Sequence, residues 1–155
     1  MSQLEIGHTI PAFTVSSTAG EFTDKNLQGK ITVLYFYPKD NTPGCTTESQ
    51  NFRDALGQFQ QLGAQVIGVS RDSLRSHERF IEKQELNFPL IADTEETLCE
   101  LFGVIKMKNM YGKQVRGIER STFIIDAQGC LLHQWRGIRV PGHVDQVLAT
   151  LADPS

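Results

Sequence analysis

An unbroken apolar segment, residues 31–37 (ITVLYFY), most strongly constrains how this chain folds. β-Branched and aromatic residues fill it without alternation, which is typical of a strand covered on both faces in a central parallel sheet. The apolar residues that follow recur at helical spacing: Phe52, Ala55, Leu56, Phe59 and Leu62. Gly63 ends this predicted helix, and residues 64–70 (AQVIGVS) are a second predicted strand. This order implies two parallel strands joined by a crossover helix.

The middle of the chain continues the alternation of helices and strands. Asp72 or Ser73 is the predicted N-cap of a helix with one partly apolar face: Leu74, His77 and Ile81. Residues 89–92 are a short predicted strand, and Thr94 is the predicted N-cap of a third helix. That helix also has an apolar face: Leu98, Leu101 and Phe102. We expect residues 105–118 (IKMKNMYGKQVRGI) to form a loop.

The two ends of the chain add antiparallel elements. Residues 121–126 (STFIID) and 131–135 (LLHQW) are predicted strands that flank a turn, which predicts a hairpin. An amphipathic helix is predicted at residues 144–151, and a small hairpin near the N-terminus within residues 11–23. The predicted fold class is therefore α/β, with a central mixed sheet flanked by helices on both faces and an added N-terminal hairpin. We expect residues 1–155 to form a single domain.

Composition excludes several classes of function. A net charge of −3 gives no reason to expect nucleic acid or an anionic membrane as a partner. The first residues lack the basic segment and apolar run of a secretory signal, and no stretch approaches the roughly 20 apolar residues that span a bilayer. Three cysteines do not make a disulfide framework. We expect a cytoplasmic protein with free thiols.

Cys45 lies between the first predicted strand and the helix that follows it (PKDNTPGCTTE). The unpaired N–H groups and positive dipole end of a first helical turn favour a thiolate, which is the reactive form of cysteine. Pro43 and Gly44 let the backbone turn tightly and approach a small ligand. Thr42 offers a hydroxyl beside the sulfur, and Pro38 an apolar shield without a backbone donor. Open α/β sheets place their sites at such strand ends.

The segment PKDNTPGCTTE contains the pattern Pro-x-x-x-Thr-x-x-Cys, and it resembles the active-site signature of the peroxiredoxins. The longer stretch YFYPKDNTPGCTTESQNFRD is similar to the Q-type, or bacterioferritin-comigratory, subfamily. The resemblance continues through VIGVSRDSLRSHERF, FPLIAD, LFGVIKMKNMYGK and GIERSTFIID, so it covers nearly the whole chain. It implies a thioredoxin-like fold, a thiol-dependent peroxidase activity and a monomer.

The resemblance also implies roles for individual residues. Cys45 matches the peroxidatic cysteine, which attacks a hydroperoxide and becomes a sulfenic acid. Thr42 matches the threonine that hydrogen-bonds the peroxide and the thiolate, and Pro38 the proline that shields the sulfur from water. Arg120, in ERSTF, matches the arginine that stabilises the thiolate and polarises the peroxide. Glu48 matches a glutamate that orients this arginine.

The chain departs from the family at both familiar positions of a resolving cysteine, where it has Gln50 and Ile81. We therefore favour a one-cysteine mechanism, in which glutathione or a glutaredoxin-like partner reduces the sulfenic acid of Cys45. The alternative is a two-cysteine mechanism in which Cys99 or Cys130 resolves Cys45 and thioredoxin is the reductant. It requires Cα atoms within about 7 Å. The substrate is hydrogen peroxide or an organic hydroperoxide.

Three rival interpretations fit the residues less well. A thioredoxin-like disulfide oxidoreductase would need Cys-x-x-Cys, and Thr42 stands in place of the first thiol. A non-catalytic thioredoxin-fold binding or chaperone module would need no activated thiol. A metal site would need clustered ligands, but the four histidines are scattered: His8, His77, His133 and His143. We expect His77 and His143 to be exposed, and the proposed chemistry needs no cofactor and no metal.

Overall fold

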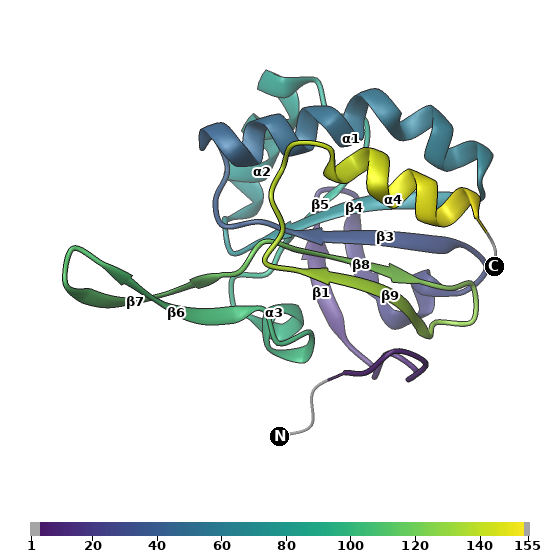
Figure 1. Cartoon of the computed structure of the whole chain (residues 1–155), viewed down its shortest axis with the longest axis horizontal. Coiled ribbons are helices and arrows are strands. Elements are labelled where there is room, and N and C mark those ends of the chain that lie inside the picture. Colours follow the sequence, from purple (N-terminus) through teal and green to yellow (C-terminus); the bar gives the residue numbers. More distant parts are fainter. Residues whose placement is uncertain (1–3, 154–155) are drawn as a thin grey trace.

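The structure is a computed structural model, and it describes residues 4–153. In this part of the chain, seven strands form the main sheet in the order β2-β1-β5-β4-β3-β8-β9 (Figure 1). These strands are β1 (Thr14–Ser17), β2 (Gly20–Thr23), β3 (Ile31–Phe36), β4 (Ala64–Ser70), β5 (Leu90–Ala92), β8 (Ser121–Ile125) and β9 (Leu131–Arg136). The helices are the short 3-10 helix η1 (Asp24–Leu27), then α1 (Pro43–Gln61), α2 (Leu74–Gln84), α3 (Thr97–Leu101) and α4 (His143–Ala152).

The sheet is mixed, as the sequence predicts. The central strand β3 pairs in parallel with β4 and antiparallel with β8. The predicted N-terminal hairpin is confirmed as β1 and β2. Every helix within residues 4–153 is too short or too polar to span a bilayer.

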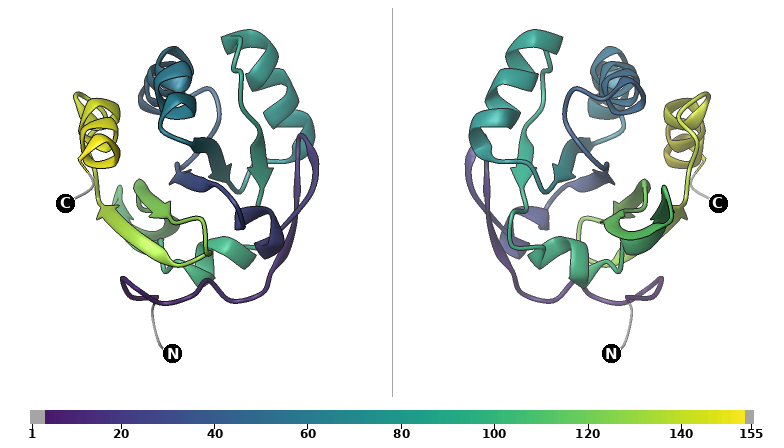
Figure 2. Two further views of the ribbon diagram at one scale, coloured as in Figure 1. Left: turned by 90° about the vertical axis from the view of Figure 1, so that its right-hand side faces the viewer. Right: turned by 90° about the vertical axis from the view of Figure 1, so that its left-hand side faces the viewer.

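Helices lie on both faces of the sheet (Figure 2). Each face carries an apolar core. Alternate residues of β3 enter different cores, because successive side chains of a strand point to opposite faces. Val33 and Tyr35 pack in the core beneath α1, α2 and α4. Leu34 and Phe36 pack in the other core, which contains the apolar residues of α3. The expectation that helices cover both faces is confirmed.

The expected loop at residues 105–118 is wrong. These residues form two antiparallel strands, β6 (Ile105–Met110) and β7 (Lys113–Ile118), in a ribbon that projects from the body of the molecule (Figure 1). The turn between them places Tyr111 and Gly112 at φ 55° and 78°, as in the tight hairpin turns that suit twisted strands. The ribbon has little apolar alternation because most of its side chains are exposed.

The expected N-cap of α3, Thr94, is also wrong. The helix begins after Glu96, which has the left-handed φ of 62° and makes no side-chain cap. The carboxylate of Asp93 instead accepts hydrogen bonds from the backbone N–H groups of Leu98 and Cys99. A buried carboxylate therefore satisfies the free donors at this helix start. For α2 the sequence left Asp72 and Ser73 as alternative N-caps. The N-cap is Ser73, whose hydroxyl oxygen accepts a hydrogen bond from the N–H of Ser76.

The pairing of β3 with β8 decides which segments meet at each end of the sheet. Phe36, at the carboxyl end of β3, pairs with Ser121, so that Arg120 lies at that end. Thr32, at the opposite end of β3, pairs with Ile125, so that the turn before Cys130 lies there. Helix α1 starts at the first of these two ends, where Cys45 follows β3.

Candidate active site

Cys45 lies in the first turn of α1, and its side chain is almost completely buried. Thr42 is the N-cap residue, and Pro43 occupies the first helical position, where its missing N–H costs nothing. Free backbone N–H groups in this turn point toward the helix start and favour negative charge there. The local sequence thus places the thiol where an anion is stabilised.

Arg120 contacts the sulfur directly. Its Nη2 lies 3.3 Å from the Sγ of Cys45, and its Nη1 donates a 2.6 Å hydrogen bond to the Oε1 of Glu48. Cys45 and Glu48 are three residues apart on α1, so they share one face of the helix. One guanidinium therefore bridges a thiol and a carboxylate. The structure brings together three of the five residues that the resemblance assigned to the site.

Glu48 is fully buried, and its second carboxyl oxygen, Oε2, has no hydrogen-bond partner among the described residues. Burial raises the pKa of Glu48 to about 7, although the charge and hydrogen bond of Arg120 act in the opposite direction. Desolvation of a carboxylate with one unpartnered oxygen outweighs its single ion pair. Glu48 therefore titrates close to neutral pH.

Thr42 and Gly44 lie on either side of the helix start. The hydroxyl of Thr42 donates a 2.8 Å hydrogen bond to the carbonyl oxygen of Lys39. A Cβ atom on Gly44 would lie 3.3 Å from the Nη2 of Arg120, which is tighter than nine in ten real Cβ contacts. The absence of a side chain at Gly44 thus leaves room for the guanidinium. Pro38 is partly buried in the segment between β3 and Thr42.

The other two cysteines lie away from Cys45. Cys99 is buried in the core on the α3 face, whereas Cys45 belongs to the core on the α1 face, so the sheet separates them. Burial, with the nearby Asp93 carboxylate, raises the pKa of Cys99 far above its ordinary value. Cys130 is half-buried at the opposite end of the sheet, where its sulfur lies 3.6 Å from the hydroxyl oxygen of Thr9.

The expectation that His77 and His143 are exposed is wrong for both. His143 is buried beside Trp135, and its Nε2 lies 2.8 Å from the hydroxyl oxygen of Thr122. Burial lowers the pKa of His143 to about 4, and the positive charge of Arg120 adds to this effect. His77 has no exposed surface, and it belongs to a buried polar cluster with Asp40. The sequence carries no local signal for either burial, because the partners come from distant segments.

His77, Asp40 and Asp72 also offer ligand atoms that lie within 4.8 Å of one another. Each of these side chains is engaged by protein groups. The two nitrogens of His77 face Asp40 and the carbonyl of Ile91, and Asp72 accepts hydrogen bonds from the N–H of Asp40 and the hydroxyl of Ser70. Hydrogen bonds thus account for the cluster without an ion.

Comparison with known proteins decides the family. The AhpC/TSA family matches residues 6–134. The chain belongs to this family. The curated Peroxiredoxin Bcp of Xanthomonas campestris is 55% identical over 123 residues, which cover 79% of this chain and 77% of that protein. Peroxiredoxin Bcp of Bacillus subtilis is 48% identical over 98% of both chains.

A solved structure of the Xanthomonas campestris bacterioferritin comigratory protein superimposes with a TM-score of 0.88, at 48% identity and over 96% of both chains. That work concerns the alkyl peroxide reduction activity of the Xanthomonas protein. The present chain is thus a peroxiredoxin of the Q, or Bcp, type with a thioredoxin-like fold, and its function is that of a thiol peroxidase. The predicted family and fold class are confirmed.

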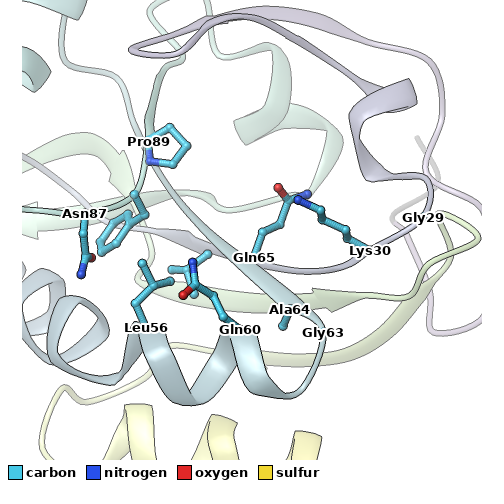
Figure 3. A pocket seen from close by; sticks show the side chains of 11 residues that line it. Gly29, Lys30, Leu56, Gln60, Gly63, Ala64, Gln65, Asn87 and Pro89 are labelled. Atoms are coloured by element: carbon cyan, nitrogen blue, oxygen red, sulfur yellow. The ribbon is translucent and has the colours of Figure 1, made fainter.

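A surface hollow of about 480 Å³ lies away from this site (Figure 3). Leu56 and Gln60, in the last turns of α1, form one wall, and Pro89 lies across from them. Leu56 is eleven residues after Cys45, which corresponds to about 16 Å along a helix. The hollow is therefore not the place where a peroxide would meet the thiol.

Proposed function

We propose that this peroxiredoxin uses Cys45 alone to reduce hydroperoxides and that an external thiol regenerates it. The Cys45 thiolate attacks the terminal oxygen of the hydroperoxide. An S–O bond forms, the O–O bond breaks, and the alkoxide or hydroxide that leaves takes up a proton. The cysteine is oxidised to a sulfenic acid, and the peroxide is reduced to an alcohol or water.

The observation that carries this proposal is the 3.3 Å contact between Arg120 Nη2 and Cys45 Sγ. Negative charge moves from the sulfur to the departing oxygen as the O–O bond breaks. A guanidinium already held beside the sulfur, and fixed on its other side by Glu48, stabilises that charge without reorganising. A packing cysteine would need no such cation.

Thr42 has a complementary role in this proposal. Its hydroxyl proton is used in the hydrogen bond to the carbonyl of Lys39, which leaves the lone pairs of its oxygen free to accept. The terminal O–H of a hydroperoxide is a donor of the matching kind. The oxygen of Thr42 would therefore accept a hydrogen bond from the O–H group of the hydroperoxide, while Arg120 faces the two peroxide oxygens.

The positions of the other cysteines support the one-cysteine mechanism. Disulfide formation needs Cα atoms within about 7 Å. Cys99 lies in the core across the sheet, and Cys130 lies at the other end of it. A small thiol such as glutathione, or a glutaredoxin-like protein, would attack the sulfenic sulfur, release water and form a mixed disulfide. A second thiol would then release Cys45 and leave a disulfide of the reductant.

We further propose that the substrates include organic hydroperoxides, in line with the alkyl peroxide reduction described for the Xanthomonas relative. The peroxiredoxin acts in the cytoplasm as a monomer, and residues 1–155 form one domain. Gel filtration with light scattering tests the monomer directly.

The proposal is tested with three variants: Cys45→Ser, Cys99→Ser and Cys130→Ser. We expect the first to abolish peroxide consumption with glutathione and glutaredoxin, and the other two to retain most of it. Folded Cys99→Ser or Cys130→Ser protein without activity would instead favour the two-cysteine mechanism with thioredoxin.

A further inference from the structure

A polar cluster lies fully inside the protein, next to the segment that joins β3 to α1. His77 and Tyr37 have no exposed surface, and Asp40 is only 4% exposed. The carboxylate of Asp40 is the centre of the cluster. Its Oδ1 accepts a 2.6 Å hydrogen bond from the hydroxyl of Tyr37, and its Oδ2 accepts one of 2.8 Å from the hydroxyl of Ser76.

His77 completes the cluster with both ring nitrogens. Its Nδ1 lies 2.8 Å from the Oδ2 of Asp40, and its Nε2 lies 2.9 Å from the carbonyl oxygen of Ile91. A carbonyl oxygen only accepts, so the Nε2 atom carries a proton. One further proton lies between His77 and Asp40, and the pair is neutral overall whichever atom holds it. A buried pair that is neutral and fully hydrogen-bonded avoids the cost of an unpaired buried charge.

The cluster connects two elements of the fold to one short segment. His77 and Ser76 lie on α2, and Ile91 lies in β5. Asp40 lies in the segment that carries Pro38 and Thr42. The next residue, Asn41, has a left-handed φ of 64°, a region that asparagine enters more readily than most residues.

One peptide unit links the cluster to Thr42. The N–H of Asp40 donates a 2.9 Å hydrogen bond to the Oδ2 of Asp72, and the carbonyl of the same peptide unit belongs to Lys39. That carbonyl accepts the hydroxyl proton of Thr42. The orientation of this peptide plane therefore decides where the oxygen of Thr42 points.

We infer that the buried Asp40–His77 pair is a positioning element of the peroxide pocket, acting through the peptide unit between Lys39 and Asp40 on the hydroxyl of Thr42. This inference rests on the proposed function of Cys45 and Thr42. It assigns a role in the rate of the peroxide reaction to His77, which lies on α2 and contacts Asp40 and β5. A displacement of about 1 Å at a reacting group costs on the order of 100-fold in rate.

Two reactions of the same sulfur separate this role from a structural one. Hydrogen peroxide needs both the thiolate and the pocket, whereas iodoacetamide needs only the thiolate. We would measure both single-turnover rates at one pH in protein whose Cys99 and Cys130 are replaced by serine. Urea unfolding of each variant shows that it is folded under the assay conditions.

Asp40→Ala and Asp40→Asn form the first comparison. Asparagine keeps an oxygen for Tyr37 and offers an N–H to the Nδ1 atom of His77, so the pair survives without charge. We expect Asp40→Ala to lower the peroxide rate about 10- to 100-fold and Asp40→Asn to stay within about 5-fold of wild type. The alkylation rate should change less than about 3-fold in both. A folded Asp40→Ala variant with the wild-type peroxide rate, or one that loses both reactions equally, would overturn the inference.

Two buried tyrosines provide a matched pair that keeps the test decisive if Asp40→Ala does not fold. Tyr37 donates to Asp40, whereas the hydroxyl of the equally buried Tyr35 lies 2.8 Å from the hydroxyl oxygen of Ser49. We expect Tyr37→Phe to slow the peroxide reaction several-fold more than Tyr35→Phe does. Equal effects would contradict the inference. Wild-type protein that is alkylated but does not react with peroxide would instead refute the proposed function itself.

Discussion

Arg120 and Cys45 are 75 residues apart in the sequence, and Nη2 of the first lies 3.3 Å from Sγ of the second. The contact exists because β8 runs antiparallel to β3 and pairs Ser121 with Phe36. The residue before β8 therefore meets the helix that follows β3. The sheet topology, rather than any local motif, places a cation beside the thiol.

Replacing Arg120 by alanine should slow the peroxide reaction of Cys45 by about 100-fold, the usual cost of removing one donor that faces developing charge. Arg120→Lys should recover only part of this, since an ammonium group cannot contact Glu48 and the sulfur with a planar fork. Stopped-flow measurement of sulfenic acid formation gives the rates. Arg116→Ala is the control, because Arg116 pairs with Glu96 and Glu100, away from the site. An Arg120→Ala rate close to that of the control would remove Arg120 from the mechanism.

Gly44→Ala should change activity and stability in opposite directions. Alanine favours a helix over glycine by up to about 1 kcal/mol, but its Cβ would lie 3.3 Å from the guanidinium of Arg120 and displace it. We expect a slower peroxide reaction in a protein that is at least as stable to urea. Gly57→Ala is the matched control on α1, where a Cβ has no neighbour within 4 Å, and it should gain stability without loss of activity. Full activity in Gly44→Ala would show that the space above Gly44 is not needed.

The raised pKa of Glu48 predicts a dependence of stability on pH. Because its folded pKa of about 7 exceeds the ordinary 4.5, the folded state binds the proton more tightly than the unfolded state does. Wild type should therefore lose stability relative to Glu48→Gln as pH rises from about 4.5 to 7. The loss is at most about 3 kcal/mol, at about 1.4 kcal/mol per pKa unit. Urea unfolding of both proteins across this range measures it. A constant difference would contradict the raised pKa.

His143 should give the opposite dependence. Burial lowers its pKa from 6.5 to about 4, so the unfolded state binds the proton more tightly. Wild type should lose stability relative to His143→Gln as pH falls from about 6.5 to 4, and the difference should be constant above pH 7. The same urea series measures it. In wild type the effects of Glu48 and His143 on the pH dependence of stability oppose each other, so each is visible only against its own single variant. A stability difference between wild type and His143→Gln that does not change with pH would mean that His143 is not buried in its neutral form.

The sequence predicted those parts of the fold whose signal is periodic. The apolar run of β3 predicted the central strand, because burial on both faces requires a continuous apolar segment. The helical spacing after Cys45 predicted α1, because burial of one face requires apolar residues at helical intervals. The β6–β7 ribbon left none, because a projecting ribbon with exposed faces has no core to require alternation.

The candidate site was predictable only in part. The spacing of Thr42 and Cys45 is local and was visible in the sequence, whereas Arg120 came from family resemblance alone. His77 was missed because its burial depends on Asp40 and on the carbonyl of Ile91, which the fold brings from other segments. Polar residues whose partners are distant in sequence carry no periodic signal.

Intact-protein mass spectrometry tests the central claim most directly. Reduced protein receives one equivalent of hydrogen peroxide together with a sulfenic-acid trap, and the modified residue is located by peptide mapping. We expect the trap on Cys45, with Cys99 and Cys130 still reduced. A loss of two hydrogens with a disulfide between Cys45 and either of the other cysteines would contradict the one-cysteine mechanism, and an unmodified Cys45 would contradict its role as the peroxidatic thiol.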